Sequence, residues 1–182
     1  MLSTFVGPLA WAVGDGTAVA TTVTKTGLLT STAASGKWAM PGNFFTAPGQ
    51  MLRIRASGRI STPAAVMGNP IFTFDIGSVA VATSPAFVSQ ASQTNVTWIL
   101  DWHLTLRTVG DGTLATFMHV GELRSVLVSS SVLVNMIPPT APVIGTGFDA
   151  SAAATATLSL TWSNATVGNT IQLHQYLIES TV

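Results

Sequence analysis

The chain contains no cysteine, which excludes a disulfide framework, a thiol nucleophile and a zinc site built on thiolates. Charged residues are also scarce, at 8 % of the 182 residues, against roughly 25 % in an ordinary soluble protein. The net charge is zero, so the basic surface that marks a nucleic-acid-binding protein is missing. No apolar run approaches the roughly 18 residues of a membrane span. We therefore expect neither nucleic acid nor a membrane among the partners.

The composition predicts a molecular surface with few charged side chains. Hydrophobic residues make up 47 % of the chain, and Ala, Thr, Ser and Val are abundant in it. A free monomer usually carries more charge for colloidal stability, so much of this surface is expected to be covered by other subunits. We expect a homo-oligomer or a larger assembly. The length fits one domain, with residues 1–16 as an N-terminal docking arm and residues 17–182 as a single domain.

Asn95–Leu127 reads as a long central hairpin. Apolar and other residues alternate before the turn, which is the pattern of a strand with one buried face. The Asp111-Gly112 pair then supplies the positive φ angles that a tight turn requires. The apolar positions before the turn are Trp98, Leu100, Trp102, Leu104 and Leu106.

Similar alternation predicts further strands along the chain. No stretch shows the period of an amphipathic helix. About eight or nine strands at this spacing indicate an all-β, antiparallel sandwich of jelly-roll type, with an immunoglobulin-like sandwich as the nearest competitor. We expect Ser163–Gly168 to join the last two strands in a second hairpin. The other expected strands are Ala18–Thr26, Lys37–Met40, Met51–Ile60, Ile71–Val81, Val132–Val134, Thr155–Trp162 and Ile171–Leu177.

The register of the central hairpin decides whether it can carry chemistry. A two-residue loop pairs Leu106 with Phe117, which suits a core, and sets Asp101 against Glu122, which is repulsive. A three-residue loop instead places His103 opposite His119, because a shift of one residue moves every side chain to the other face. Only the second register offers a metal site.

The chain lacks the motifs of the common enzyme classes. Metalloenzymes of the cupin type use two histidines two residues apart with a glutamate shortly after, and no such set occurs here. There is also no Gly-x-Ser-x-Gly elbow and no phosphate-binding glycine loop. We therefore predict that the protein is not an enzyme and has no catalytic residue, no metal and no cofactor.

Two groups of residues are candidates for contact with a partner. Three arginines lie on the same face of the strand Met51–Ile60. They either bind carboxylates of a partner or keep a neutral sheet from pairing edge to edge. The N-terminal arm is too broken for a helix and too apolar for a free tail. The candidate contact residues are Phe5, Leu9, Trp11, Arg53, Arg55 and Arg59.

The ordering of these segments resembles that of jelly-roll virion structural proteins of tailed bacteriophages. The resemblance spans about residues 17–180, contains no catalytic motif and transfers no individual functional residue. It implies a compact jelly roll, often trimeric, made in the host cytoplasm and placed in the virion on the capsid exterior. The segments that carry it are Lys37–Phe45, Pro48–Arg59, Trp98–Trp102 and Gly168–Tyr176.

The resemblance and the composition together predict a structural virion protein. The first hypothesis is a homotrimeric capsid decoration protein that binds the major capsid protein or other virion proteins, with the arm as a clamp. The second is a receptor-binding or tail-fibre domain in which loops such as Thr83–Thr94 recognise a host glycan. A cupin-like or hydrolytic enzyme is the third, and it requires a bound metal or turnover.

Overall fold

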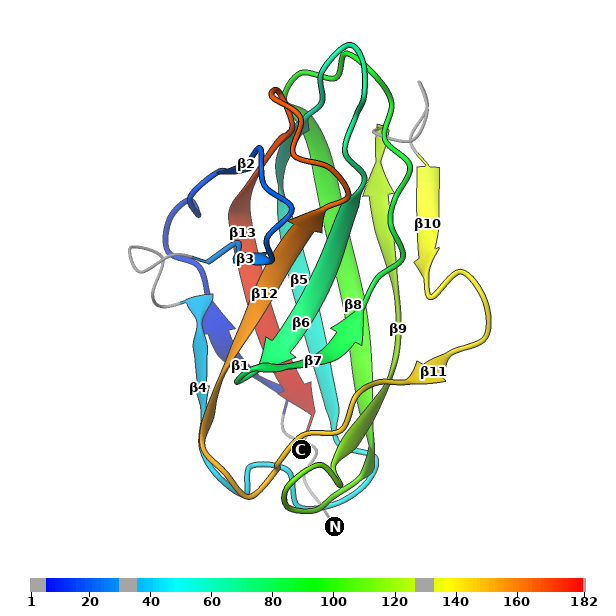
Figure 1. The fold of residues 1–182 in the computed structure, drawn as a ribbon. Helices are drawn as coiled ribbons and strands as arrows, with labels where there is room; N and C mark the ends of the chain where they lie inside the picture. Colours follow the sequence, from blue (N-terminus) through cyan, green and yellow to red (C-terminus); the bar gives the residue numbers. More distant parts are fainter. Residues whose placement is uncertain (1–5, 30–35, 127–132, 182) are drawn as a thin grey trace.

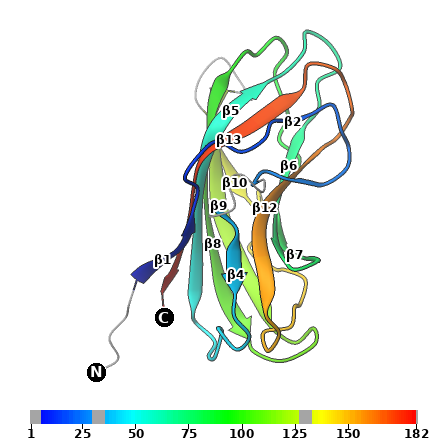
Figure 2. The same cartoon turned by 90° about the vertical axis from the view of Figure 1, so that its left-hand side faces the viewer.

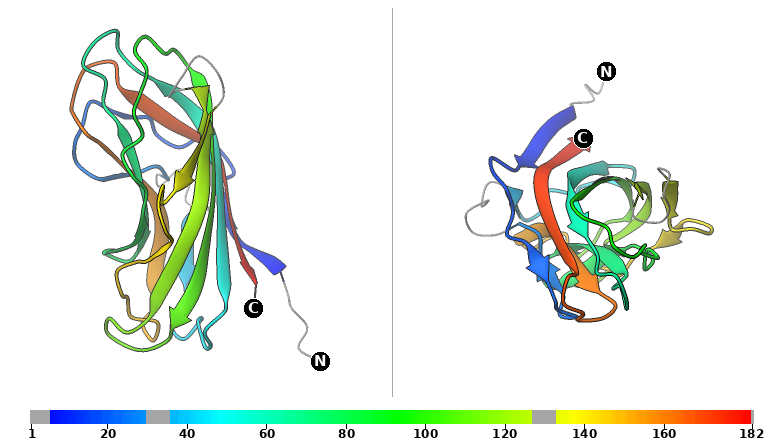
Figure 3. Two further views of the ribbon diagram at one scale, coloured as in Figure 1. Left: turned by 90° about the vertical axis from the view of Figure 1, so that its right-hand side faces the viewer. Right: turned by 90° about the horizontal axis from the view of Figure 1, so that it is seen from above.

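The computed structural model describes residues 6–29, 36–126 and 133–181 (Figure 1). These residues form thirteen β-strands and no α-helix, so the predicted all-β class is confirmed. Two antiparallel sheets pack against each other as a sandwich, and Figures 2 and 3 show the two layers edge-on. The first and last described residues, Val6 and Thr181, lie opposite each other at one end of the large sheet.

The large sheet has eight strands, in the order β1-β13-β5-β8-β9-β10, with β2 also paired to β13 and β11 to β9. Its long members are long because apolar and polar residues alternate without interruption by proline. Its strands are β1 (Val6–Trp11), β2 (Val19–Ala20), β5 (Met51–Ser61), β8 (Val96–Thr108), β9 (Thr116–Ser125), β10 (Leu133–Ile137), β11 (Val143–Ile144) and β13 (Thr170–Thr181).

The small sheet has five strands, in the order β3-β12-β6-β7, with β4 also paired to β12. It covers one face of the large sheet, and the core fills the space between the two layers. The core is strongly aromatic, since Phe117 stacks on Phe148 at 5.1 Å and meets the edge of Phe45 at 5.2 Å. The strands are β3 (Thr26–Gly27), β4 (Trp38–Met40), β6 (Pro70–Ile76), β7 (Val79–Thr83) and β12 (Ala154–Trp162).

The central hairpin is present as predicted, and its register is the one expected for a two-residue loop. Leu106 lies opposite Phe117, and Asp101 lies opposite Glu122. A bulge beyond Leu106 lengthens the turn itself, so the Leu114 N–H donates to the Asp111 carbonyl at 3.1 Å. All five predicted apolar positions of β8 are buried.

The expected count of eight or nine strands is lower than the thirteen observed, because β1 and β11 were not expected as strands and two expected strands each divide into two. Ala18–Thr26, expected as one strand, crosses from the large sheet at β2 to the small sheet at β3, and Thr21 breaks it with a positive φ of 51°. Ile71–Val81 likewise divides into β6 and β7 at Gly77, whose φ is 61°.

The expected second hairpin is wrong. The strands on either side of Ser163–Gly168 lie in different sheets, β12 in the small one and β13 in the large one. The buried Asn169 anchors this crossover, since its Oδ1 accepts from the Gly68 N–H at 3.0 Å. Alternation of apolar residues was equally compatible with both arrangements, because each strand faces the same core.

The alternation between buried and outward side chains changes phase within β13. Ile171 and Leu173 are buried as expected, but Leu177 is only half-buried and its neighbours Tyr176 and Ile178 face the core. A bulge between Leu173 and Gln175 shifts the pairing with β5 by one residue. Such a shift exchanges the two faces of the strand from that point on.

Candidate interaction surface

The large sheet buries one face against the small sheet and leaves the other uncovered by any described residue, as the edge-on views in Figures 2 and 3 show. We call this uncovered side of the large sheet the outer face. Residues directly opposite each other on paired strands share a face. The pairing registers therefore give its composition row by row.

Three rows of side chains form the centre of the outer face. One row runs across six strands and begins and ends with an exposed apolar side chain: Trp11, Leu177, Arg55, Asp101, Glu122 and Met136. The row on one side of it contains Glu179, Arg53, His103 and Val120. The row on the other side contains Gln175, Ser57, Ile99, Arg124 and Val134.

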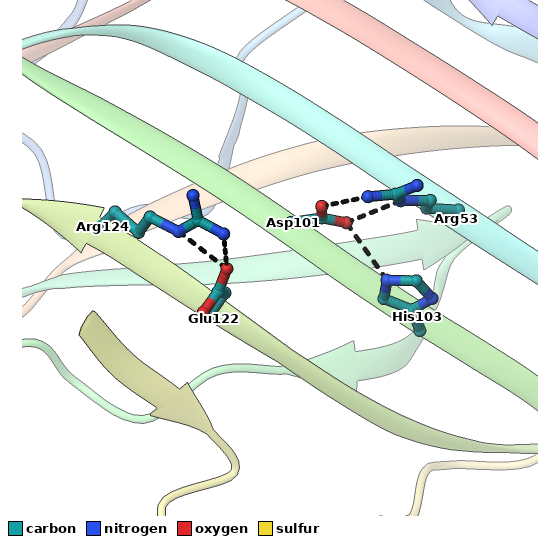
Figure 4. A network of polar contacts seen from close by, with 5 residues as sticks. All are labelled: Arg53, Asp101, His103, Glu122 and Arg124. Carbon is teal, nitrogen blue, oxygen red and sulfur yellow. Dashed lines mark hydrogen bonds and ion pairs between the residues drawn. The ribbon is translucent and has the colours of Figure 1, made fainter.

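The repulsion between Asp101 and Glu122 is relieved by an arginine for each carboxylate (Figure 4). Arg53 binds Asp101 with two hydrogen bonds, from Nε to Oδ1 at 2.9 Å and from Nη2 to Oδ2 at 2.5 Å. Arg124 pairs with Glu122 on its own strand. The hydrogen bonds from Arg53 hold the pKa of the Asp101 carboxyl below its ordinary value. The outer face is thus internally neutralised at its centre.

The two hairpin histidines lie on opposite sides of the sheet. His103 is on the outer face, with Nε2 at 3.3 Å from Asp101 Oδ1. His119 is buried in the core opposite Leu104, and the Trp102 indole N–H donates to its Nδ1 at 3.3 Å. Burial lowers the pKa of His119. The register that would have joined the two histidines in a metal site is therefore wrong, and no three His, Asp or Glu side chains within the described ranges gather into a metal-binding group.

The three candidate arginines do share the outer face of β5, but they are not equivalent. Arg53 is occupied by Asp101, and Arg59 donates from Nε and Nη2 to Gln172 Oε1 at 3.1 and 2.8 Å. Arg55 is exposed and makes no side-chain hydrogen bond or ion pair to any described residue. Of the stripe, Arg55 is the guanidinium available to a partner carboxylate.

The N-terminal candidates are placed unequally. Phe5 lies outside the described residues, Leu9 is half-buried against the core, and Trp11 is 51 % exposed on the outer face beside Leu177. Their segment forms β1, which pairs with β13 and leans out with it from the body of the sandwich (Figures 2 and 3). Deleting residues 1–15 would therefore remove a strand of the large sheet as well as a contact segment.

Apolar side chains on the outer face are the feature that residue patterns alone did not single out. Ile99 is 44 % exposed and Val120 is 42 % exposed, each at a position where the alternation calls for a polar residue. That mismatch was the available signal. Two hollows open beside them, one lined by Arg55, Ser57, Ile99, Gln175 and Leu177, and one lined by Asp101, His103, Val120, Glu122 and Met136.

Three loops meet at the end of the sandwich opposite the termini (Figure 1). The predicted surface loop after β7 is held to the β5–β6 loop, since Thr62 Oγ1 donates to the Gln90 carbonyl at 2.5 Å and the Ser92 N–H to the Pro63 carbonyl at 2.9 Å. Asn164, from the crossover, donates to the Met67 carbonyl at 2.9 Å. The loop end is therefore an ordered polar surface.

No protein-family model matches the chain, and a search of curated proteins finds no match either. Within the described part of the chain, no helix has the length and apolarity needed to cross a membrane. The outer face and the loop end are therefore the two candidate contact surfaces of the molecule.

Proposed function

We propose that this chain is a structural protein of a bacteriophage virion, which decorates the outside of the capsid as a homotrimer and carries out no catalysis. The observation that carries the proposal is the outer face. It places exposed Trp11, Ile99 and Val120 around neutralised ion pairs, on a sheet that no described residue covers. Mixed apolar and satisfied polar groups of this kind are typical of protein–protein contact surfaces.

The sandwich is assigned in this proposal to the jelly-roll type. In a jelly roll the first strand lies beside the last, the last beside the third, and the third beside the sixth. In the other sheet the second strand lies beside the seventh, the seventh beside the fourth, and the fourth beside the fifth. The orders β1-β13-β5-β8 and β4-β12-β6-β7 support this assignment, with β9, β10 and β11 inserted after the sixth strand.

The outer face is also well suited to bind without rearrangement. The Arg53–Asp101 and Arg124–Glu122 pairs hold their side chains in place before a partner arrives. Preorganised groups lose little conformational entropy on binding, so more of the contact energy appears as affinity. The unpaired Arg55 then adds specificity toward a carboxylate on the capsid surface.

The proposal is tested by an arginine placed in the centre of the outer face. In phage that carry Ile99→Arg, we expect the number of copies per virion to fall by about tenfold or more, because a charge buried in a contact without a partner costs several kcal/mol. The matched control is Val167→Arg, which adds the same charge at an 80 % exposed position in the crossover. Copies per particle are counted by quantitative mass spectrometry of purified virions.

Equal occupancy of Ile99→Arg and Val167→Arg would exclude the outer face as the capsid contact. Absence of the wild-type chain from purified virions would exclude the virion role altogether. The trimer is checked separately by sedimentation, where we expect three times the chain mass of 18.8 kDa, or a whole multiple of that trimer mass if trimers associate further.

A receptor-binding role at the tail is the second candidate, and the ordered loop end favours it. Polar loops that are fixed to one another by hydrogen bonds provide donors and acceptors at set positions, as glycan recognition requires. Binding to a glycan array, together with labelling of the tail tip, would favour this role over decoration.

A further inference from the structure

The edge of the large sheet at β10 and β11 combines exposed apolar side chains with an absence of charge. Residues 126–148 contain no Asp, Glu, Lys, Arg or His, and both β10 and β11 lie within this segment. Five of their seven residues expose a large apolar side chain: Leu133, Val134, Met136, Val143 and Ile144. Figure 1 shows the two strands at the margin of the sheet beyond β9.

An open edge strand presents unpaired backbone N–H and C=O groups at every second residue. Proteins usually protect such an edge with a lysine, a proline or a bulge. β1, at the opposite edge of the same sheet, contains Pro8 and a bulge. β10 contains neither proline nor charge and pairs with β9 in unbroken register, and no described strand pairs with its other side.

We propose that β10 pairs with β10 of a second copy of this chain, antiparallel across a twofold axis at Asn135, to give one sheet that continues through both molecules. Val134 of each copy then lies opposite Met136 of the other, and Leu133 lies opposite Ile137. This inference goes beyond the proposed virion role and does not depend on it. Within a particle, the contact links neighbouring subunits.

A second copy is the occupant that the composition of the edge favours. A twofold contact brings each strand against itself, and like charges directly opposite each other destabilise a strand pair. A charge-free strand avoids that penalty. A charged partner segment would gain no ion pair from this edge, since no charged residue lies in β10 or β11.

Asn135 provides a separate reason for the position of the axis. Its side-chain Nδ2 is buried without a hydrogen-bond acceptor, although a buried amide donor without a partner destabilises a fold. At the axis, the two Asn135 side chains lie opposite each other, and rotation toward the open edge lets each amide N–H donate to the other's Oδ1. Paired asparagines of this kind also fix register.

The absence of cysteine allows a direct test on the full chain. Residues opposite each other in antiparallel strands have Cα atoms about 4.5–5.5 Å apart, within the range of a disulfide. Under mild oxidation, we expect Asn135→Cys to give a covalent dimer of twice 18.8 kDa on a non-reducing denaturing gel. Val167→Cys, exposed in the crossover loop, is the control, and it should crosslink at least about tenfold more slowly.

A second variant keeps the test valid if the Asn135 substitution impairs folding. Val134 and Met136 are each 52 % exposed, so the double variant Val134→Cys/Met136→Cys should fold normally. It should also form the covalent dimer, because these positions face each other across the axis. Crosslinking of both edge variants at the rate of Val167→Cys would overturn the inference, whereas the proposed virion role would be judged only by occupancy on particles.

Discussion

His119 is buried against Trp102, and its burial makes the stability of the fold depend on pH. Because the pKa of His119 is lowered in the folded state, the unfolded chain takes up a proton that the folded chain does not. The free energy of unfolding should therefore be at its full value above pH ~6.5 and fall as the pH drops below it, by up to about 1.4 kcal/mol per pH unit for one group.

We expect His119→Gln to remove that dependence, since glutamine does not titrate and its amide oxygen can accept from Trp102. Urea unfolding at pH 7, 6 and 5 measures the slope. Val167→Gln, which changes an exposed side chain that does not titrate, is the control and should keep the wild-type slope. Identical slopes for wild type and His119→Gln would contradict a lowered pKa of His119 in the folded state.

Arg53 and Asp101 form the ion pair at the centre of the outer face. A double-mutant cycle with Arg53→Met and Asp101→Asn should give a coupling free energy of about 1 kcal/mol, since both groups are partly exposed and solvent screens them. The coupling should shrink in 1 M salt. Because the pKa of Asp101 is lowered, the pair stabilises the fold above pH ~4 and this contribution is lost as the pH falls further. A coupling near zero at low salt would contradict the pairing.

Contacts between segments far apart in the sequence could not be predicted from the alternation of apolar and polar residues. Asp75 lies between the core residues Phe74 and Ile76, so alternation directs it away from the core, but it is only 3 % exposed. Lys25 Nζ and Ser159 Oγ each donate to it at 2.7 Å from segments far along the chain. Local alternation specifies which face a side chain takes, but not what covers that face.

At the scale of elements, the long strands were predictable because a single period runs through each of them. β5 and β8 have the buried faces that their sequences indicate. The errors lie where the backbone departs from that period, at the β13 bulge and at the crossover after β12. Neither leaves a mark in the apolar pattern, since the core accepts side chains from both sheets.

The β5–β13 pairing offers a stability prediction at this scale. A Cβ atom added at Gly58 would lie 1.9 Å from the Gln172 backbone carbonyl oxygen, so the strands must separate to admit it. We expect Gly58→Ala to lower the free energy of unfolding by about 3 kcal/mol or more. Gly14→Ala, with no atom within 4 Å of the added Cβ, should change it little. Urea midpoints compare the two variants, and equal midpoints would contradict the close pairing.

At the scale of the whole molecule, ion pairs and exposed apolar side chains lie together on the outer face of the large sheet. At the centre of the outer face, Arg53 pairs with Asp101 and Arg124 with Glu122, and exposed apolar side chains surround these ion pairs. Composition alone predicted that the surface would be covered by neighbours. It could not predict which surface, because that depends on the sheet that β1, β5, β8, β9 and β13 build together.

The proposed virion role is tested most directly by an electron cryo-microscopy map of virions that carry this chain. We expect density for the sandwich on the capsid exterior, in groups of three, with the outer face of the large sheet against a neighbouring subunit. Density only at the tail tip, or an outer face that points to solvent without a contact, would contradict it.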